Sequence, residues 1–169
     1  RRQRQMCIRD RIKADHVALR KAIQIKIMAP DSVAGHYLGI QLKNGKKGFI
    51  SKTIRDNHFV AKIKKTGTYT IAQDTISPII KPSQLYDQRW LSNFKTLRFT
   101  IDDRETGIRS YQAIIDGKWA LFEYEPKKKE ITFNFDEYFS FEGAKHKLKI
   151  TVIDNVGNES NHELIFYRK

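Results

Sequence analysis

The sequence predicts an all-β protein: an immunoglobulin-like antiparallel β-sandwich over residues 74–169, preceded by a smaller, partial antiparallel β domain over residues 14–73. Apolar residues alternate with polar ones over short stretches, which is the pattern of strands that bury one face. Two pairs, Asn44-Gly45 and Asp116-Gly117, supply the positive φ angles that tight hairpin turns need. In the second half, turn residues recur about every 8 to 12 residues, the spacing of an immunoglobulin-like sandwich.

The composition supports two small folded domains. The chain has 169 residues, of which 40% are hydrophobic and 11% aromatic, so apolar material suffices for packed cores. No apolar run approaches the roughly 18 residues that cross a bilayer. We therefore expect no transmembrane segment.

Residues 1–13 are expected to form a disordered tail. The letters RRQRQMCIRDR show neither strand nor helix spacing, and they resemble a translated sequencing-adapter string, which would make the tail non-native. A native charged tail and a basic arm that binds nucleic acid are the alternatives. The single cysteine, Cys7, lies in this segment and cannot form an internal disulfide.

In the partial domain over 14–73, the alternation predicts five short strands, with Asn44-Gly45 as the turn between the second and the third. The strands fall at 23–27, 38–42, 47–51, 59–63 and 69–71. One sheet needs a second layer to cover its apolar face, so we expect this part to be the C-terminal half of a larger sandwich.

The domain boundary is expected at Asp74, because Pro78 interrupts the strand pattern there. About seven strands follow, with Asp116-Gly117 as a hairpin turn and residues 154–158 as the last turn. The strands fall at 79–80, 97–101, 111–115, 118–125, 131–135, 148–152 and a final stretch with Leu164 and Phe166 inward.

The net charge of +13 lies entirely before Asp74. Residues 1–13 carry +5, residues 14–73 carry +8, and residues 74–169 have fifteen charges of each sign. Seven lysines of the first half are predicted in turns or on outward strand positions: Lys43, Lys46, Lys47, Lys52, Lys62, Lys64 and Lys65. They protect strand edges or attract anionic envelope polymers or lipid head groups. Nucleic acid is disfavoured as a partner, because no aromatic residues are interleaved with these lysines.

Four segments carry a family resemblance: DTISPII at 74–80, ETGIRSY at 105–111, IDGKWALFEYE at 115–125 and HKLKITVIDNVGNES at 146–160. In this order they resemble the C-terminal immunoglobulin-like module of secreted bacterial lysostaphin/LytM-type zinc endopeptidases. The preceding GTYTIAQDT is similar to the β domain before that module. The resemblance covers about residues 20–169. It implies a protein that is secreted or sits in the cell envelope or periplasm, with its own upstream peptidase domain as partner.

The zinc-binding motifs of such peptidases, H-x-x-x-D and H-x-H, are missing from the sequence. Its histidines are His16, His36, His58, His146 and His162, and none has the required spacing. There is also no G-x-S-x-G nucleophile motif. We therefore expect a fragment without enzyme activity or cofactor, with zinc only in an upstream catalytic domain.

Two sets of residues are candidate binding sites. Oxygen ligands for calcium are offered at strand ends by Asp74, Asp102, Asp103, Asp154 and Asn155, for which turn capping is the alternative role. Aromatic faces for sugars or a partner are offered by Trp90, Trp119, Phe122 and Tyr124. Trp119 and Leu121 alternate with Ala120 and Phe122, so one of these two pairs must face the core.

The sequence thus predicts a non-catalytic structural or targeting module of a secreted, cell-wall-directed peptidase, in contact with a cell-envelope polymer. An adhesive or carbohydrate-binding module of a bacterial surface protein is the alternative. A basic nucleic-acid-binding protein is a third hypothesis, which would need polyanion binding that survives removal of residues 1–13.

Overall fold

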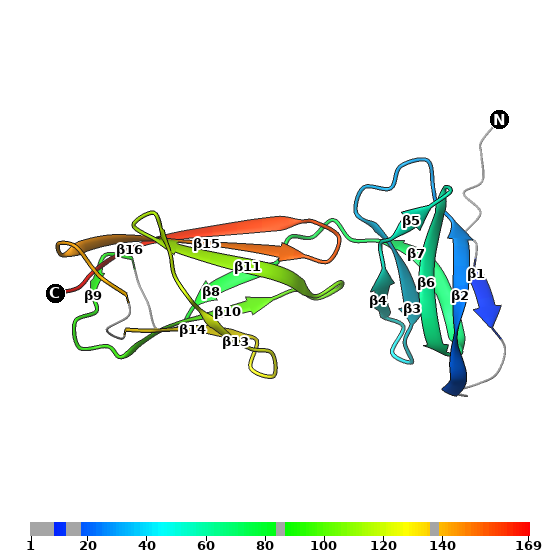
Figure 1. The fold of residues 1–169 in the computed structure, drawn as a ribbon, viewed down its shortest axis with the longest axis horizontal. Coiled ribbons are helices and arrows are strands. Elements are labelled where there is room, and N and C mark those ends of the chain that lie inside the picture. The colour runs from blue at the N-terminus through cyan, green and yellow to red at the C-terminus, as the bar shows by residue number, and fades with distance from the viewer. Residues whose placement is uncertain (1–8, 13–17, 84–86, 136–138) are drawn as a thin grey trace. The chain divides into compact units, whose positions relative to one another are not determined.

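The computed structural model describes residues 9–12, 18–83, 87–135 and 139–169, and its regular elements there are all β-strands (Figure 1). Within these ranges no helix is long and apolar enough to cross a membrane. The chain divides into two compact units, Arg1–Ile76 with Asn155–Gly157, and Ser77–Asp154 with Asn158–Lys169. The division falls three residues after the boundary expected at Asp74, because the amide of Asp74 still donates to the carbonyl of Gly35 in the first unit.

Two sheets face each other in the first unit. Its strands are β1 (Arg9–Ile12), β2 (Ala18–Met28), β3 (His36–Gln41), β4 (Lys47–Ser51), β5 (Ile54–Arg55), β6 (His58–Lys65) and β7 (Gly67–Gln73). One sheet has the order β1-β7-β3-β4 and the other β2-β6-β5. Leu38, Phe59 and Tyr69 are buried in one apolar cluster drawn from both sheets. Each sheet covers the apolar face of the other, so the second layer that the sequence requires lies within this unit.

The strand β1 differs from the disordered tail expected over residues 1–13. It pairs antiparallel with β7, from Arg9 opposite Thr70 to Ile12 opposite Gly67. Backbone hydrogen bonds to β7 hold this edge strand, which its side-chain pattern did not predict. For residues 9–12 the expectation of disorder is wrong, whereas residues 1–8, with Cys7, lie outside the described residues.

Hairpin turns set the register of the first unit. Gly45 has a φ of +79° in the turn between β3 and β4, which confirms the Asn44-Gly45 hairpin. A second tight turn joins β5 to β6, where Asp56 and Asn57 have φ values of 49° and 59°. Asn and Asp tolerate this left-handed conformation better than other residues with a Cβ atom.

An immunoglobulin-like β-sandwich forms the second unit. Its strands are β8 (Ile79–Pro82), β9 (Arg89–Trp90), β10 (Thr96–Asp102), β11 (Ile108–Ile115), β12 (Lys118–Trp119), β13 (Glu123–Glu125), β14 (Glu130–Asn134), β15 (Lys145–Asp154) and β16 (Glu159–Tyr167). One sheet has the order β13-β14-β10-β8 and the other β12-β11-β15-β16-β9. The first order matches strands D-E-B-A of the immunoglobulin scheme, and β11-β15-β16 matches C-F-G.

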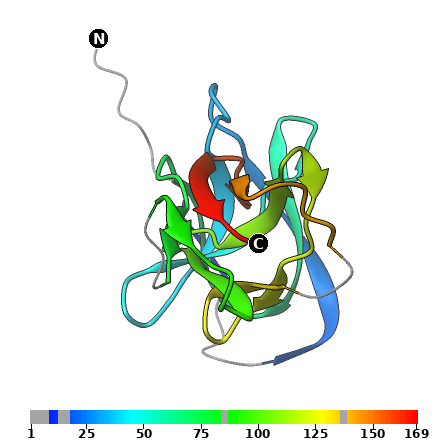
Figure 2. The same ribbon diagram turned by 90° about the vertical axis from the view of Figure 1, so that its left-hand side faces the viewer.

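The two sheets of the second unit pack face to face. Figure 2 shows the sheet with β15 and β16 (orange and red) as one layer and the sheet with β10 and β14 as the other. Between them lie the inward residues of the alternating strands, among them Phe99, Leu148, Ile150 and Val152, all without exposed surface. The strands expected at 97–101, 131–135 and 148–152 thus bury the faces that their alternation predicts.

The strand expected at 118–125 is broken in the structure. Lys118 and Trp119 continue the hairpin with β11 in one sheet, whereas Glu123–Glu125 pair with β14 in the other. Ala120 and Phe122 are buried where the chain crosses between the sheets. The crossing explains why apolar residues stand on both faces of this stretch.

Candidate functional site

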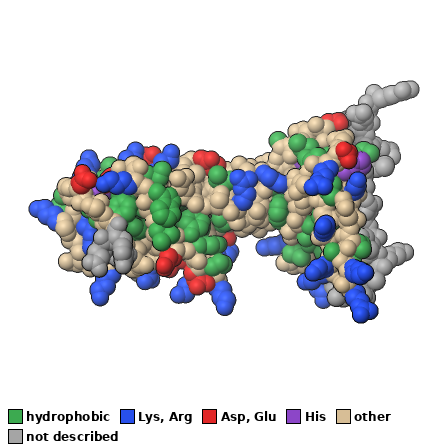
Figure 3. Space-filling view, viewed as in Figure 1, with side chains coloured by type: hydrophobic (Ala, Val, Ile, Leu, Met, Phe, Trp, Pro, Cys, Tyr) green, Lys and Arg blue, Asp and Glu red, His purple; other side chains and the backbone are tan. Residues whose placement is uncertain are grey.

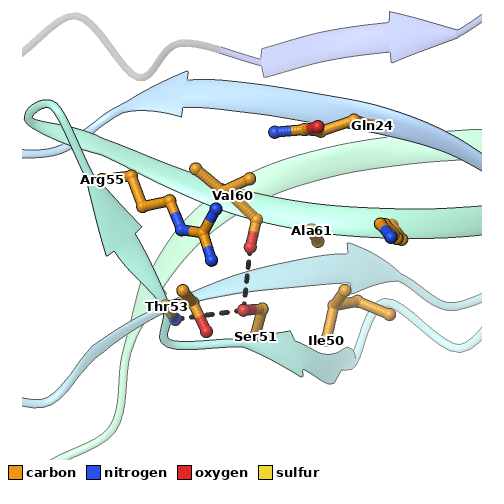
Figure 4. Close-up of a pocket in the computed structure, with 8 residues that line it drawn as sticks. Gln24, Ile50, Ser51, Thr53, Arg55, Val60 and Ala61 are labelled. Atoms are coloured by element: carbon orange, nitrogen blue, oxygen red, sulfur yellow. Dashed lines mark hydrogen bonds between the residues drawn. The ribbon is translucent and has the colours of Figure 1, made fainter.

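A groove on the first unit is the candidate site. Its volume is about 280 Å³, and its wall is formed by Gln24, Ile50, Ser51, Thr53, Arg55, Val60, Ala61 and Lys62. Figure 4 shows the Arg55 guanidinium and the Gln24 amide on one side of this space, with Ser51 and Thr53 across from them. The side chains come from β2, β4, β5, β6 and, at Thr53, the link between β4 and β5. Of these strands, β2, β4 and β5 are edge strands of their sheets.

A corner of hydrogen bonds fixes one wall of the groove. The Ser51 hydroxyl donates to the carbonyl of Val60 at 2.9 Å and accepts from the amide of Thr53 at 3.0 Å. The amide of Val60 in turn donates to the carbonyl of Thr53 at 2.9 Å. Residues 51–53 are therefore held against β6, and the shape of this wall does not depend on a ligand.

Hydrogen-bond donors surround the groove. Arg55 is placed by the tight β5–β6 turn, in which it pairs with His58. Gln24 and Lys62 lie directly opposite each other on β2 and β6, so both project from the same face of that sheet. No residue of the groove wall carries a carboxylate. The groove thus offers a guanidinium, an ammonium, an amide and a hydroxyl above the apolar side chain of Val60.

The charge around the groove is positive, and few acids accompany it in the sequence. Between residues 18 and 73 the sequence has eleven Lys and Arg residues but only two acids, Asp31 and Asp56. All eleven cations are exposed, and none forms an ion pair with a residue that the structure describes. Figure 3 shows Lys and Arg side chains spread over the first unit, with few acidic ones among them on the face in view.

Some lysines of the second unit form ion pairs with acids of the same unit. Lys118 pairs with Glu142 at 3.0 Å, and Lys147 pairs with Glu163 at 2.8 Å. The hydrogen bond from Lys147 holds the pKa of the exposed Glu163 carboxyl below its ordinary value. The two units therefore differ in surface charge as the sequence predicts.

The calcium candidates form turns in the structure. Asp103 accepts through Oδ2 from the amides of Glu105, Thr106 and Gly107, at 3.2, 2.7 and 2.6 Å. Asp154 accepts from the amide and the side chain of Asn158, at 2.8 and 2.7 Å. The carboxylates of Asp103 and Asp154 come within 4.8 Å of one another. Turn capping is thus shown for both, and calcium binding by their oxygens stays a prediction.

The remaining calcium candidates are Asp102, Asp74 and Asn155. Asp102 forms an ion pair with Lys129 at 2.8 Å. Asp74 belongs to the first unit, where its Oδ1 accepts from the amide of Ile76 at 2.9 Å. Asn155 lies in the turn between β15 and β16.

The aromatic candidates separate into surface and core residues. Trp119 and Trp90 are 63% and 53% exposed, and Trp90 packs on Tyr167 with ring centroids 5.2 Å apart. Phe122 is 1% exposed and contacts other core rings, so its assignment as a binding residue is wrong. Tyr124 is half-buried against Tyr111.

One Asp-His pair is structural. The Nδ1 atom of His146 lies 2.7 Å from Oδ2 of Asp116, the kind of contact that orients a catalytic imidazole. However, His146 has no exposed surface and packs between the rings of Phe141 and Phe166. No substrate reaches this imidazole, so the pair links the β11–β12 turn to β15.

The groove is not evident from the sequence, although Lys62 is among the lysines predicted on the surface. Arg55 and Gln24 were missed, because the groove depends on how β2, β4 and β5 meet around β6. The only local signal was Asp56-Asn57, which indicates the turn that places Arg55.

Comparisons with known proteins identify no family for the chain. No family model matches the chain, and no curated protein matches it. Eleven chains of solved structures are similar. One, described as "Structures of Clostridium thermocellum CbhA fibronectin(III)-like modules", has 11% identity and a TM-score of 0.43, over 89% of this chain and 87% of that one. A likeness of this degree carries no functional conclusion, and the fold assignment follows from the sheets and cores described above.

Proposed function

We propose that the chain is a non-catalytic accessory module that holds a larger secreted protein at an anionic polymer of the bacterial cell envelope. The observation that carries this proposal is the uneven charge. Eleven exposed cations between residues 18 and 73 form no ion pair with any residue that the structure describes, whereas residues 74–169 have as many acids as bases. Exposed positive charges that form no ion pair attract a polyanion over a Debye length, which is about 8 Å at physiological salt.

We assign a different role to each of the two units. The second unit is a packed sandwich in which Lys118, Lys129 and Lys147 form ion pairs, and in this proposal it serves as a spacer. The first unit supplies the contact through its basic surface. The mechanism is surface binding, which raises the local concentration of the attached protein near its substrate.

Purified bacterial cell walls provide the test. We expect the chain to sediment with walls that keep their anionic polymers and to stay in solution after these polymers are extracted. Equal sedimentation with extracted walls would contradict the proposal, because the neutral glycan would then be the ligand.

The proposal includes the identity of the larger protein to which this module belongs. The sequence resemblance supports a cell-wall-directed zinc peptidase, and the sequence of the full reading frame tests that identity. A preceding domain with the H-x-x-x-D and H-x-H motifs is expected. Further tandem sandwich repeats in its place would contradict a peptidase parent.

A carbohydrate-binding or adhesive role is the second candidate, and the outer face of the five-stranded sheet favours it. Trp119 pairs with Ile114, and Trp90 pairs with Tyr167, on the face that also carries Lys145 and the other outward residues of β15. Two exposed tryptophans on one sheet face can stack on sugar rings. Quenching of tryptophan fluorescence by neutral cell-wall glycan, lost in Trp90→Ala and Trp119→Ala, would favour this role.

A further inference from the structure

We propose that the groove at Arg55 and Lys62 binds one phosphate group of a phosphodiester polymer. This inference rests on the proposed function, and it adds a defined site and a ligand class to it. The starting point is that the polar side chains of the groove wall include four donors, on Gln24, Thr53, Arg55 and Lys62, and no carboxylate. Such a set repels a cation and leaves an anion as the complementary ligand.

The donors reach the groove from several strands, which favours phosphate over carboxylate. Arg55 enters from β5, Gln24 from β2 and Lys62 from β6. A carboxylate is planar and is satisfied by one guanidinium fork, whereas the oxygens of a phosphate point in several directions. Thr53 lies across the groove from Arg55 and Gln24, so donors face the space from two sides, which matches a tetrahedral group better than a planar one.

The site is preorganised and partly apolar. The hydrogen bonds among Ser51, Thr53 and Val60 fix the wall, so only the long side chains must become ordered on binding. Val60 is nearly buried at the groove, and Ile50 adds further apolar surface. Apolar walls lower the local dielectric constant, which strengthens the attraction between Arg55 and an anion.

Nucleic acid is the less suitable source of the phosphodiester. Proteins that bind single strands stack bases on aromatic rings, and the groove wall contains no aromatic residue. A polymer of alcohol phosphates, such as poly(glycerol phosphate), presents phosphates without bases and needs no stacking partner. We therefore assign the groove to that chemistry.

Two double variants of the full chain form the test. Arg55→Gln with Lys62→Gln removes two charges at the groove. Lys43→Gln with Lys46→Gln removes two charges at the β3–β4 turn, on residues that do not line the groove. All four side chains are exposed, so thermal unfolding should be unchanged and both variants should remain folded.

Affinity for poly(glycerol phosphate) is measured at low salt. We expect the groove variant to bind about tenfold or more weakly, as expected for lost charged hydrogen bonds, and the turn variant to lose less than about threefold. Inorganic phosphate, titrated into the labelled full chain, should shift the amide NMR signals of Thr53, Val60 and Lys62 in the wild type and not in the groove variant.

The outcomes separate the two proposals. Equal weakening in both double variants, or no localised shift with phosphate, would overturn the groove site and leave the proposed function standing. Tighter binding of polygalacturonate, a carboxylate polymer, or of double-stranded DNA at the same salt would overturn the phosphodiester assignment. If the wild type binds no anionic polymer at all, the proposed function itself fails.

Discussion

Replacement of Phe122 by alanine should destabilise the second unit far more than replacement of either of its apolar neighbours. Phe122 is 1% exposed, and its ring centroid lies 5.3 Å from that of Phe133 and 6.1 Å from that of Phe99. Truncation leaves a cavity in this aromatic cluster. We expect a loss of about 3–5 kcal/mol in the free energy of unfolding, and a Tm lower by more than about 10 °C.

Leu121 and Trp119 are the matched controls, because both flank the same crossing and are more than half exposed. Alanine at either position should change the free energy of unfolding by less than about 0.5 kcal/mol. Both tryptophans of the chain lie in the second unit, so urea unfolding followed by tryptophan fluorescence reports that unit, and Trp90 still reports in Trp119→Ala. A cost below about 1 kcal/mol for Phe122→Ala, or an equal cost for Leu121→Ala, would refute the assignment of the two faces.

Three further results are expected. Asp103→Ala should lower the stability of the second unit by about 1–3 kcal/mol in the same urea assay, because three backbone amides lose their acceptor; an unchanged midpoint would show that water replaces the carboxylate. Burial raises the pKa of Tyr69, whose hydroxyl donates to the carbonyl of Lys65, above its ordinary 10.0. As the pH rises, Tyr69 therefore ionises in the unfolded chain before it ionises in the folded one. The stability that the Tyr69 hydroxyl contributes below pH 10.0 is lost as the pH rises through its folded-state pKa. Tyr69→Phe should reduce this alkaline loss of stability in thermal melts, and an alkaline profile identical to that of the wild type would contradict the expectation. If Asp103 and Asp154 hold calcium, millimolar calcium should raise the Tm of the second unit, and a shift below about 1 °C would exclude the site.

Local pattern was enough to predict the regular strands. Leu148, Ile150 and Val152 alternate with lysine and threonine, and the structure buries all three fully. The Asn44-Gly45 and Asp116-Gly117 turns occur where the sequence places them, because the positive φ at Gly45, Asp116 and Gly117 is a local requirement. Such features depend on residues close in the chain.

Features that depend on distant partners were not predictable. Arg89 and Trp90 form β9 only by pairing with the far end of β16, and their own sequence shows no alternation. Equally, the break between Trp119 and Glu123 arises because the chain changes sheets, which the hydrophobic pattern does not reveal. The candidate site has the same origin, since Gln24 and Arg55 are about thirty residues apart and meet only through β6.

Salt dependence of binding tests the central claim most directly. The full chain is titrated with poly(glycerol phosphate) at several salt concentrations, and log K is plotted against log salt. If the basic first unit makes the contact, the slope should be about −2 or steeper, corresponding to release of several counterions, and charge-removing changes at Lys147 and Lys149 in the second unit should leave it unchanged. A slope near zero, or a slope set by the second unit, would contradict the account.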